Sequence, residues 1–124
     1  MANYRELKVW QFGIEIAKDV YRLTSDFPAE ERFGLVTQMR RSAVSISSNI
    51  AEGHARNSTQ EMIRFCSIAL GSVAELETQL VIARELNFGK TVESVALGQS
   101  LDELSRMLHG LIRTFRNRQQ PRSK

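Results

Sequence analysis

The side chains of this chain that are best suited to catalysis or metal binding are two histidines, one cysteine and 14 acidic residues. A di-iron site in a helical bundle needs a glutamate three residues before a histidine on two helices, and neither His54 nor His109 has one. Cys66 has no neighbouring motif that would supply a base, so we interpret it as a buried structural thiol. The sequence also lacks a glycine-rich phosphate loop. We therefore predict no enzymatic activity, no catalytic residues, no metal, no cofactor and no small-molecule substrate.

Positive charge gathers at the C-terminal end of the chain. Residues 113–124 hold five of the 17 basic residues and no acid, which leaves 12 basic against 14 acidic residues elsewhere. Such an asymmetry favours a polyanionic partner. Basic residues at the end of a helix also interact favourably with its dipole, and the two interpretations stay open.

Length and composition narrow the class of protein. The 124 residues suffice for one domain, and no apolar run approaches the roughly 18 residues of a membrane span. The first ten residues carry charges where a signal peptide would be apolar, and a lone cysteine forms no internal disulfide. We expect a cytoplasmic protein with no membrane partner.

Four segments carry apolar or small residues at the spacing of a helix that buries one face: residues 7–24, 35–53, 62–83 and 97–115. No stretch alternates with a period of two over the length of a strand. Short polar breaks separate the segments. The sequence therefore predicts an all-α protein, an antiparallel up-down-up-down four-helix bundle.

We place this bundle at residues 1–118 and a basic, flexible tail at residues 119–124. The second predicted helix has Ser42, Asn49 and Gly53 on its core stripe. Ser42 and Gly53 would admit close approach of neighbouring helices. Asn49 falls level with Trp10, whose indole is its nearest candidate partner, and we interpret Asn49 as a register-setting polar residue rather than a ligand contact.

Residues at the same height on neighbouring antiparallel helices also predict two ion pairs between helices. Arg40 or Arg41 falls level with Glu75, and Glu52 falls level with Arg64. If exposed, each pair contributes about 0 to 1 kcal/mol, so it orients the helices more than it stabilises them.

The first predicted helix has two apolar stripes side by side, and its polar residues occupy a narrow arc. We assign the bundle core to the stripe of Leu7, Trp10, Ile14, Ala17, Tyr21 and Thr24. The second stripe would then be exposed, which indicates an oligomer interface. A bundle twisted enough to bury both stripes is the alternative. The predicted interface residues are Val9, Phe12, Ile16, Val20 and Leu23.

The predicted topology brings three segments to one end of the bundle: the start of the first helix, the turn after the second and the end of the fourth. Cations outnumber acids there, so we expect a basic pole that binds phosphates with strong salt dependence. Aromatic residues for base stacking are scarce, which argues against sequence-specific readout. The predicted nucleic-acid-binding residues are Arg5, Arg56, Arg113, Arg116, Arg118, Arg122 and Lys124.

The sequence resembles a known family in three runs: YRELKVWQ, FPAEERFGLVTQMRRSAVSISSNIAEG and FCSIALGSVAELETQL. This is the family of four-helix bundle proteins encoded within intervening sequences of bacterial large-subunit ribosomal RNA genes. The resemblance covers the first three predicted helices and, more loosely, the fourth. It implies homopentamers of antiparallel four-helix bundles and no known enzymatic activity.

Seven residues occupy characteristic positions of that family, and the resemblance implies a catalytic role for none of them. The accessory variability determinant of diversity-generating retroelements is similar in fold, and there a basic pentamer binds a reverse transcriptase and nucleic acid. The characteristic residues are Arg40, Arg41, Asn49, Glu52, Gly53, Glu75 and Glu77.

Together these patterns predict a nonenzymatic, homo-oligomeric bundle that binds RNA or a nucleoprotein through its basic pole. The alternative is a protein-binding adaptor or an accessory subunit, for example of a reverse transcriptase in a retroelement, with no direct role at nucleic acid.

Overall fold

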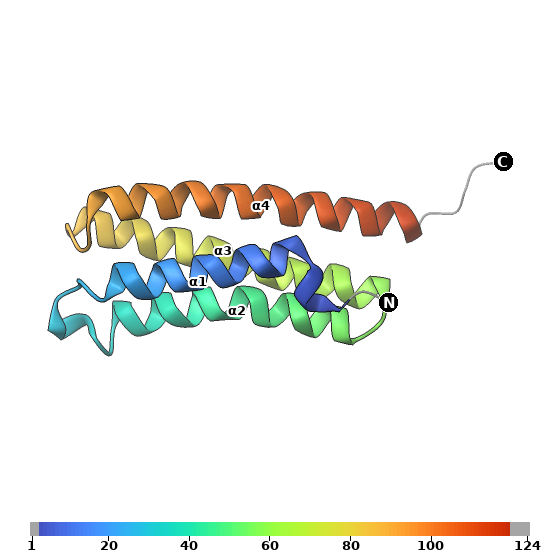
Figure 1. Cartoon of the computed structure of the whole chain (residues 1–124), viewed down its shortest axis with the longest axis horizontal. Coiled ribbons are helices and arrows are strands. Elements are labelled where there is room, and N and C mark those ends of the chain that lie inside the picture. The colour runs from blue at the N-terminus through green and yellow to red at the C-terminus, as the bar shows by residue number, and fades with distance from the viewer. Residues whose placement is uncertain (1–2, 120–124) are drawn as a thin grey trace.

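A computed structural model of the protein describes residues 3–119, which fold into four long helices and two single turns of 3₁₀ helix. No strand occurs in this range, so the predicted all-α class with four helices is confirmed. The four helices lie side by side, and the chain reverses direction at each turn (Figure 1). The elements are η1 (Tyr4–Glu6), α1 (Lys8–Thr24), η2 (Ala29–Glu31), α2 (Leu35–Ala55), α3 (Thr59–Glu85) and α4 (Thr91–Gln119).

Each helix packs against two neighbours, α1 and α3 both lying against α2 and α4. Helix α4 includes Gln119, the first residue of the predicted tail, and residues 120–124 lie outside the described range. Helix α3 is apolar enough to cross a membrane by length and composition, a property that the core helices of bundles share. It is the one helix of residues 3–119 with that property.

The core confirms the predicted stripe of α3 and most of that of α4. All seven residues of the predicted α3 stripe are buried, as are four leucines of the α4 stripe. They are Met62, Cys66, Ala69, Val73, Leu76, Leu80 and Ala83 of α3, and Leu97, Leu101, Leu104 and Leu108 of α4. Towards the end of α4 the stripe drifts, because seven residues of an α-helix turn about 20° short of the two full turns that a heptad repeat needs. Ile112 is buried there, whereas Leu111 and Phe115 are partly exposed.

The predicted division of α1 into a core stripe and an exposed stripe is wrong. Four of the five residues assigned to an oligomer interface, Val9, Ile16, Val20 and Leu23, are buried inside the chain's own core. Phe12, the fifth, is partly buried against the same core. Because the core covers the middle of the wide apolar arc, the stripe assigned to the core lies at its edge. Within that stripe Trp10, Ile14 and Ala17 are partly exposed, and Tyr21 is exposed.

The close approach of α1 to α2 explains which part of the arc is buried. A Cβ atom at Gly13 would collide with the Ser47 hydroxyl. That hydroxyl donates a hydrogen bond of 3.2 Å to the carbonyl of Trp10. A side chain of α2 therefore contacts the backbone of α1 directly. Gly13 and Ser47 are buried, and neither adds to a hydrophobic pattern.

Asn49 does not use Trp10 as its hydrogen-bond partner. Its Nδ2 donates to the carbonyl of Ser45 at 2.8 Å and to the Ser45 hydroxyl at 2.9 Å, both on its own helix. The Ser45 hydroxyl also lies 2.8 Å from the hydroxyl of Ser72 on α3. Asn49 is partly exposed rather than buried, so this amide extends a polar contact between α2 and α3 instead of crossing the core.

The α1–α2 turn and the α3–α4 turn lie at the other end of the bundle and pack against each other. Gly89, between α3 and α4, has φ 81°, and a Cβ atom there would lie 2.6 Å from Cδ1 of Leu23. Phe27, after α1, packs against Phe88 with ring centroids 5.6 Å apart. The α1–α2 and α3–α4 turns are thereby joined at the end of the bundle opposite the start of α1 and the end of α4 (Figure 1).

Candidate nucleic-acid interface at one end of the bundle

The start of α1, the turn between α2 and α3, and the end of α4 meet at one end of the bundle (Figure 1). Between them lies an open pocket of about 480 Å³. This end, which we call the basic pole, comprises η1, residues 52–64 and residues 111–119. The pocket is lined by Leu7, Gly53, His54, Asn57, Ser58, Thr59, Met62, Leu111, Phe115 and Arg118.

The α2–α3 turn shapes one wall of this pocket. Asn57 has φ 54°, a left-handed conformation that asparagine tolerates better than most residues. Ser58 then caps α3, and its hydroxyl accepts a hydrogen bond of 3.3 Å from the backbone N–H of Glu61. The positive end of the α3 dipole therefore lies at the pocket.

Arg56 and Arg64 lie close to this turn in the chain without lining the pocket, and their charges are compensated. Arg56 pairs with Glu52 at 2.9 Å and with Glu61 at 3.6 Å, and Arg64 pairs with Glu61 at 3.4 Å. Both guanidinium groups also lie over the ring of Phe65, at 5.2 and 5.0 Å from its centroid. The predicted Glu52–Arg64 pair is thus replaced by pairs closer in sequence. Arg56, a predicted nucleic-acid-binding residue, is held in an ion-pair cluster.

The end of α4 supplies the uncompensated charge. Arg113, Arg116 and Arg118 are exposed, and none forms an ion pair with another residue in the described part of the chain. The guanidinium of Arg118 lies 5.0 Å from the ring centroid of Phe115, so a cation and an aromatic face adjoin at the pocket. Arg122 and Lys124 lie outside the described residues.

Arg5 adds a cation from the other side of the pole. Asn3 caps η1 and forms a capping box with Glu6, which holds this short turn in place. The guanidinium of Arg5 lies 5.8 Å from the ring centroid of Tyr4, and that ring meets Trp10 edge to face at 5.4 Å. Sequence reasoning named Arg5 but missed the Arg–aromatic pairs. The spacing of Phe115 and Arg118, three residues apart on one helix, is the signal that could have found one of them.

The two histidines and the cysteine, the side chains best suited to catalysis or metal binding, lie in different parts of the fold. His54 lines the pocket, His109 is exposed on α4, and Cys66 is fully buried in the core. Burial raises the pKa of the Cys66 thiol to about 11, because the thiolate would lose its hydration. Among residues 3–119, no three histidine, cysteine or acidic side chains are grouped so as to hold a metal ion.

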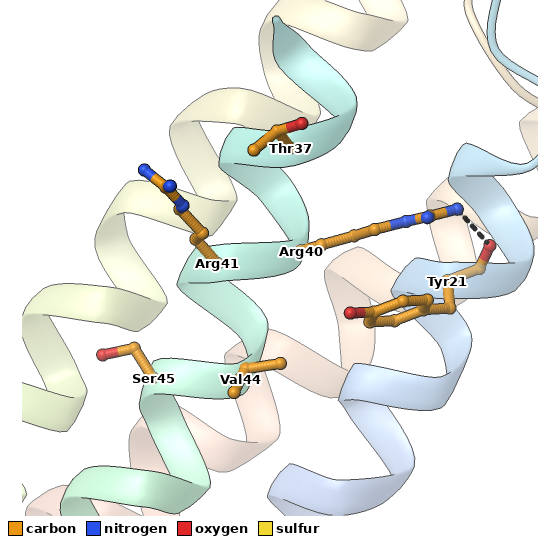
Figure 2. A pocket seen from close by; sticks show the side chains of 6 residues that line it. All are labelled: Tyr21, Thr37, Arg40, Arg41, Val44 and Ser45. Atoms are coloured by element: carbon orange, nitrogen blue, oxygen red, sulfur yellow. Dashed lines mark hydrogen bonds between the residues drawn. The ribbon is translucent and has the colours of Figure 1, made fainter. Parts of the chain in front are cut away.

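A second surface holds the two arginines of the QMRRS motif. Arg40 stacks on Tyr21, with the guanidinium carbon 4.4 Å from the ring centroid, and its Nε donates to the Thr24 hydroxyl at 3.0 Å. Figure 2 shows Arg40 reaching towards Tyr21 on α1, whereas Arg41 points away from it. Arg40 therefore links α2 to α1 through the Tyr21 ring and the Thr24 hydroxyl.

The predicted pairing of Arg40 or Arg41 with Glu75 is not formed within the described chain. Arg40 is engaged with α1, and Arg41 and Glu75 are both exposed. Of the other characteristic residues, Gly53 is buried against Phe65 and Met62, and Glu77 is partly exposed on α3.

Comparison with known proteins places the chain in a family. The pattern of the 23S rRNA-intervening sequence protein family matches residues 5–110. The chain belongs to this family. The matched range takes in most of η1, helices α1 to α3 and most of α4, so it covers nearly the whole described bundle.

A solved structure has a similar fold. It is the crystal structure of a protein with unknown function from the S23 ribosomal protein family of Bacteroides thetaiotaomicron VPI-5482. The TM-score is 0.77 at 24% sequence identity, and the similarity covers 85% of this chain and 95% of that one. No curated protein matches the chain.

Proposed function

We propose that this member of the 23S rRNA-intervening sequence protein family is a nonenzymatic, homo-oligomeric protein of the cytoplasm that binds RNA through its basic pole. The observation that carries the proposal is the cluster of exposed arginines at the end of α4, which lacks acidic partners in the described chain. The family's name, which refers to an intervening sequence of 23S rRNA, supports RNA as the polyanion.

The geometry favours phosphate contacts over base readout. Guanidinium groups form paired hydrogen bonds with phosphate oxygens, and Arg113, Arg116 and Arg118 present three of them on the last turns of one helix. The start of α3 adds the positive end of a helix dipole. Tyr4 and Phe115 offer partly exposed rings, which a base could stack on without being identified by sequence.

A charge-reversal variant tests the proposal. The variant Arg113→Glu, Arg116→Glu and Arg118→Glu would be titrated against a fluorescein-labelled single-stranded RNA at several salt concentrations. The plot of the logarithm of the binding constant against the logarithm of the salt concentration has a negative slope. Loss of three phosphate contacts should make that slope less steep by about 2. The matched control is Arg32→Glu, Arg84→Glu and Lys90→Glu, which changes the net charge equally near the opposite turns.

Equal RNA affinity of the two variants would overturn the basic pole as the site, because net charge alone would then explain binding. Absence of salt-dependent binding by the unmodified protein would overturn RNA binding altogether. Circular dichroism of both variants, compared with the parent, separates loss of binding from loss of helix.

We propose a pentamer as the oligomeric form, which rests on the resemblance to the family. Exposed apolar side chains on α3 support self-association, since Val81 is 57% and Leu86 is 54% exposed. The interface lies away from the Val9 stripe of α1, because that stripe fills the core.

The same apolar surface favours a second candidate function, an adaptor that binds another protein, such as the reverse transcriptase of a retroelement. An adaptor of this kind needs no phosphate contacts. Its binding to a partner protein would survive the three reversals at the end of α4, whereas RNA binding would not.

A further inference from the structure

The pocket at the basic pole has an apolar interior and a polar rim. Its apolar lining residues, among them Met62, Leu111 and Phe115, are buried or partly buried. Its polar lining residues include Asn57 and Arg118, which are exposed. The volume of about 480 Å³ falls within the range of about 300 to 1,000 Å³ that is typical of ligand sites. The pocket therefore has the size and the polarity of a site that encloses one small group.

The charges around this pocket favour an anionic ligand. No acidic residue lines it, and the nearby Glu52 and Glu61 are engaged in ion pairs. Arg118 contributes a positive charge to the lining. At the start of α3 the backbone N–H groups of Thr59 and Gln60 have no acceptor among residues 3–119. Free N–H groups at the first turn of a helix bind phosphate oxygens well.

Two planar groups stand together at the pocket. The guanidinium of Arg118 lies 5.0 Å from the ring centroid of Phe115, and both residues line the cavity. Unpaired bases stack on aromatic rings and on guanidinium planes. A nucleotide joins a flat, largely apolar base to an anionic phosphate, so its two parts match the interior and the rim of the pocket.

We propose that this pocket receives one unpaired base of a bound RNA strand, with the base against Phe115 and its phosphate near Arg118 and the start of α3. The inference deepens the proposed function and rests on it, because it names the form of RNA that the basic pole selects. A base within a duplex is paired and stacked on both sides, so it does not enter a concave site unless it is flipped out. Single-stranded RNA therefore gains a contact that double-stranded RNA lacks.

Removing the bases from the strand tests the pocket. A fluorescein-labelled strand of uridines would be compared with a strand of equal length built from abasic ribose phosphates. Both strands offer the same phosphates to the arginines. The uridine strand should bind about tenfold more tightly at the same salt concentration, because stacking adds to the phosphate contacts.

The variant Phe115→Leu removes the ring and keeps an apolar side chain. It should weaken binding of the uridine strand about fivefold or more, and leave the affinities for the abasic strand and for a blunt-ended RNA duplex unchanged. The salt dependence should stay the same, since no phosphate contact is lost. The matched control is Phe33→Leu at the opposite end of the bundle, which should change none of the three affinities. The Phe33 ring is 85% exposed and also has a guanidinium 5.3 Å from its centroid, but it lines no part of this pocket.

A second variant acts on the pocket without touching the ring. Thr59→Leu places a larger side chain in the lining and should remove the same tenfold preference for the uridine strand. Circular dichroism of all variants, compared with the parent, separates a filled pocket from a misfolded chain. A preference for the uridine strand that survives in both Phe115→Leu and Thr59→Leu would overturn the pocket as the site of the base.

Binding of a single nucleotide tests the pocket without an RNA strand. The chain has two histidines, and His54 lines the pocket whereas His109 is exposed on α4 and does not. Adenosine 5′-monophosphate at millimolar concentration should shift the imidazole proton resonances of His54 more than those of His109, because the ring current of a bound base acts at short range. Ribose 5-phosphate carries the same phosphate without a base and should shift His54 clearly less. Equal effects of the two compounds, or equal shifts at both histidines, would overturn the proposal.

Failure of this proposal is distinguishable from failure of the proposed function. Salt-dependent binding with equal affinity for the uridine and abasic strands overturns the base pocket and leaves phosphate binding at the basic pole standing. A protein that binds no RNA strand, and whose His54 still responds to adenosine 5′-monophosphate, overturns RNA binding and leaves the nucleotide pocket standing.

Discussion

Gly13 of α1 lies against Ser47 of α2 so closely that a side chain larger than hydrogen has no room there. The Ser47 hydroxyl fills that space and donates a hydrogen bond to the Trp10 carbonyl on the same helix as the glycine. This contact holds α1 close to α2 beside the part of its wide apolar arc that faces the core.

Replacing Gly13 with alanine should lower the free energy of unfolding by about 1 to 3 kcal/mol, because the new methyl group collides with the Ser47 hydroxyl. In a Ser47→Ala background the nearest atoms would be at 3.4 and 3.5 Å, an ordinary packing distance. There Gly13→Ala should cost almost nothing. Urea denaturation of the four proteins of this cycle measures the coupling, and additive effects would contradict the contact.

Gly53→Ala should also destabilise the protein, by about 1 to 2 kcal/mol, since a Cβ atom at Gly53 would lie 2.8 Å from Cβ of Phe65. The matched control is Gly110→Ala on α4, where the nearest heavy atom is 3.9 Å away. That change should raise stability by about 0.5 to 1 kcal/mol through helix propensity. Thermal unfolding of both variants gives the comparison, and equal effects would contradict the packing at Gly53.

Arg40 and Tyr21 should be coupled in a double-mutant cycle. The guanidinium stacks 4.4 Å from the ring centroid, so replacing both residues with alanine should show about 0.5 to 1 kcal/mol of coupling in chemical denaturation. Arg22 and Asp19, an exposed pair on α1, serve as the control and should couple by about 0.5 kcal/mol or less. Coupling no larger than in this control would contradict a structural role for the stacked arginine.

The thiol of Cys66 should make stability fall at alkaline pH. Burial raises its pKa to about 11 in the folded protein, so the thiol stays protonated there while it ionises in the unfolded chain. The contribution is constant below the unfolded pKa of about 8.5 and is lost as pH rises towards 11. Over that range the free energy of unfolding should fall by on the order of 3 kcal/mol through this group.

The measurement compares the parent with Cys66→Ala between pH 8 and pH 10.5. The substitution should lower stability at pH 8 and also flatten the decline with pH, and the decline is the informative quantity. Two curves of equal slope would show that the thiol is not desolvated. Slow reaction of native Cys66 with a thiol reagent at pH 8 is the independent check.

Much of the fold follows from the sequence because hydrophobic periodicity is a local property. In α3 and in most of α4 one narrow stripe repeats without competition, so a single face is available to the core and burial follows it. Gly89, in the turn after α3, likewise indicates a left-handed backbone from the sequence alone, since few other residues adopt that conformation.

In α1, by contrast, two stripes of similar hydrophobicity lie side by side, and periodicity alone does not choose between them. The choice depends on Ser47, on another helix, and on Gly13, which carries no hydrophobic signal. Asn49 likewise bonds to Ser45 on its own helix, because the rotamer that reaches Ser45 satisfies the amide without crossing to another helix. Arg56 pairs with Glu52 on α2 and with Glu61 at the start of α3, both closer in sequence than the pairing that was predicted for Glu52.

The sequence by itself determined four helices, their order and the buried stripes of α3 and of most of α4. Each of these features depends on residues within a few turns of one another. It also determined that cations accumulate at the end of α4. Only the tertiary structure decided which face of α1 is buried, which arginines keep their charge uncompensated and which apolar residues of α3 stay exposed. These depend on contacts between helices far apart in the chain, and no local pattern records such contacts.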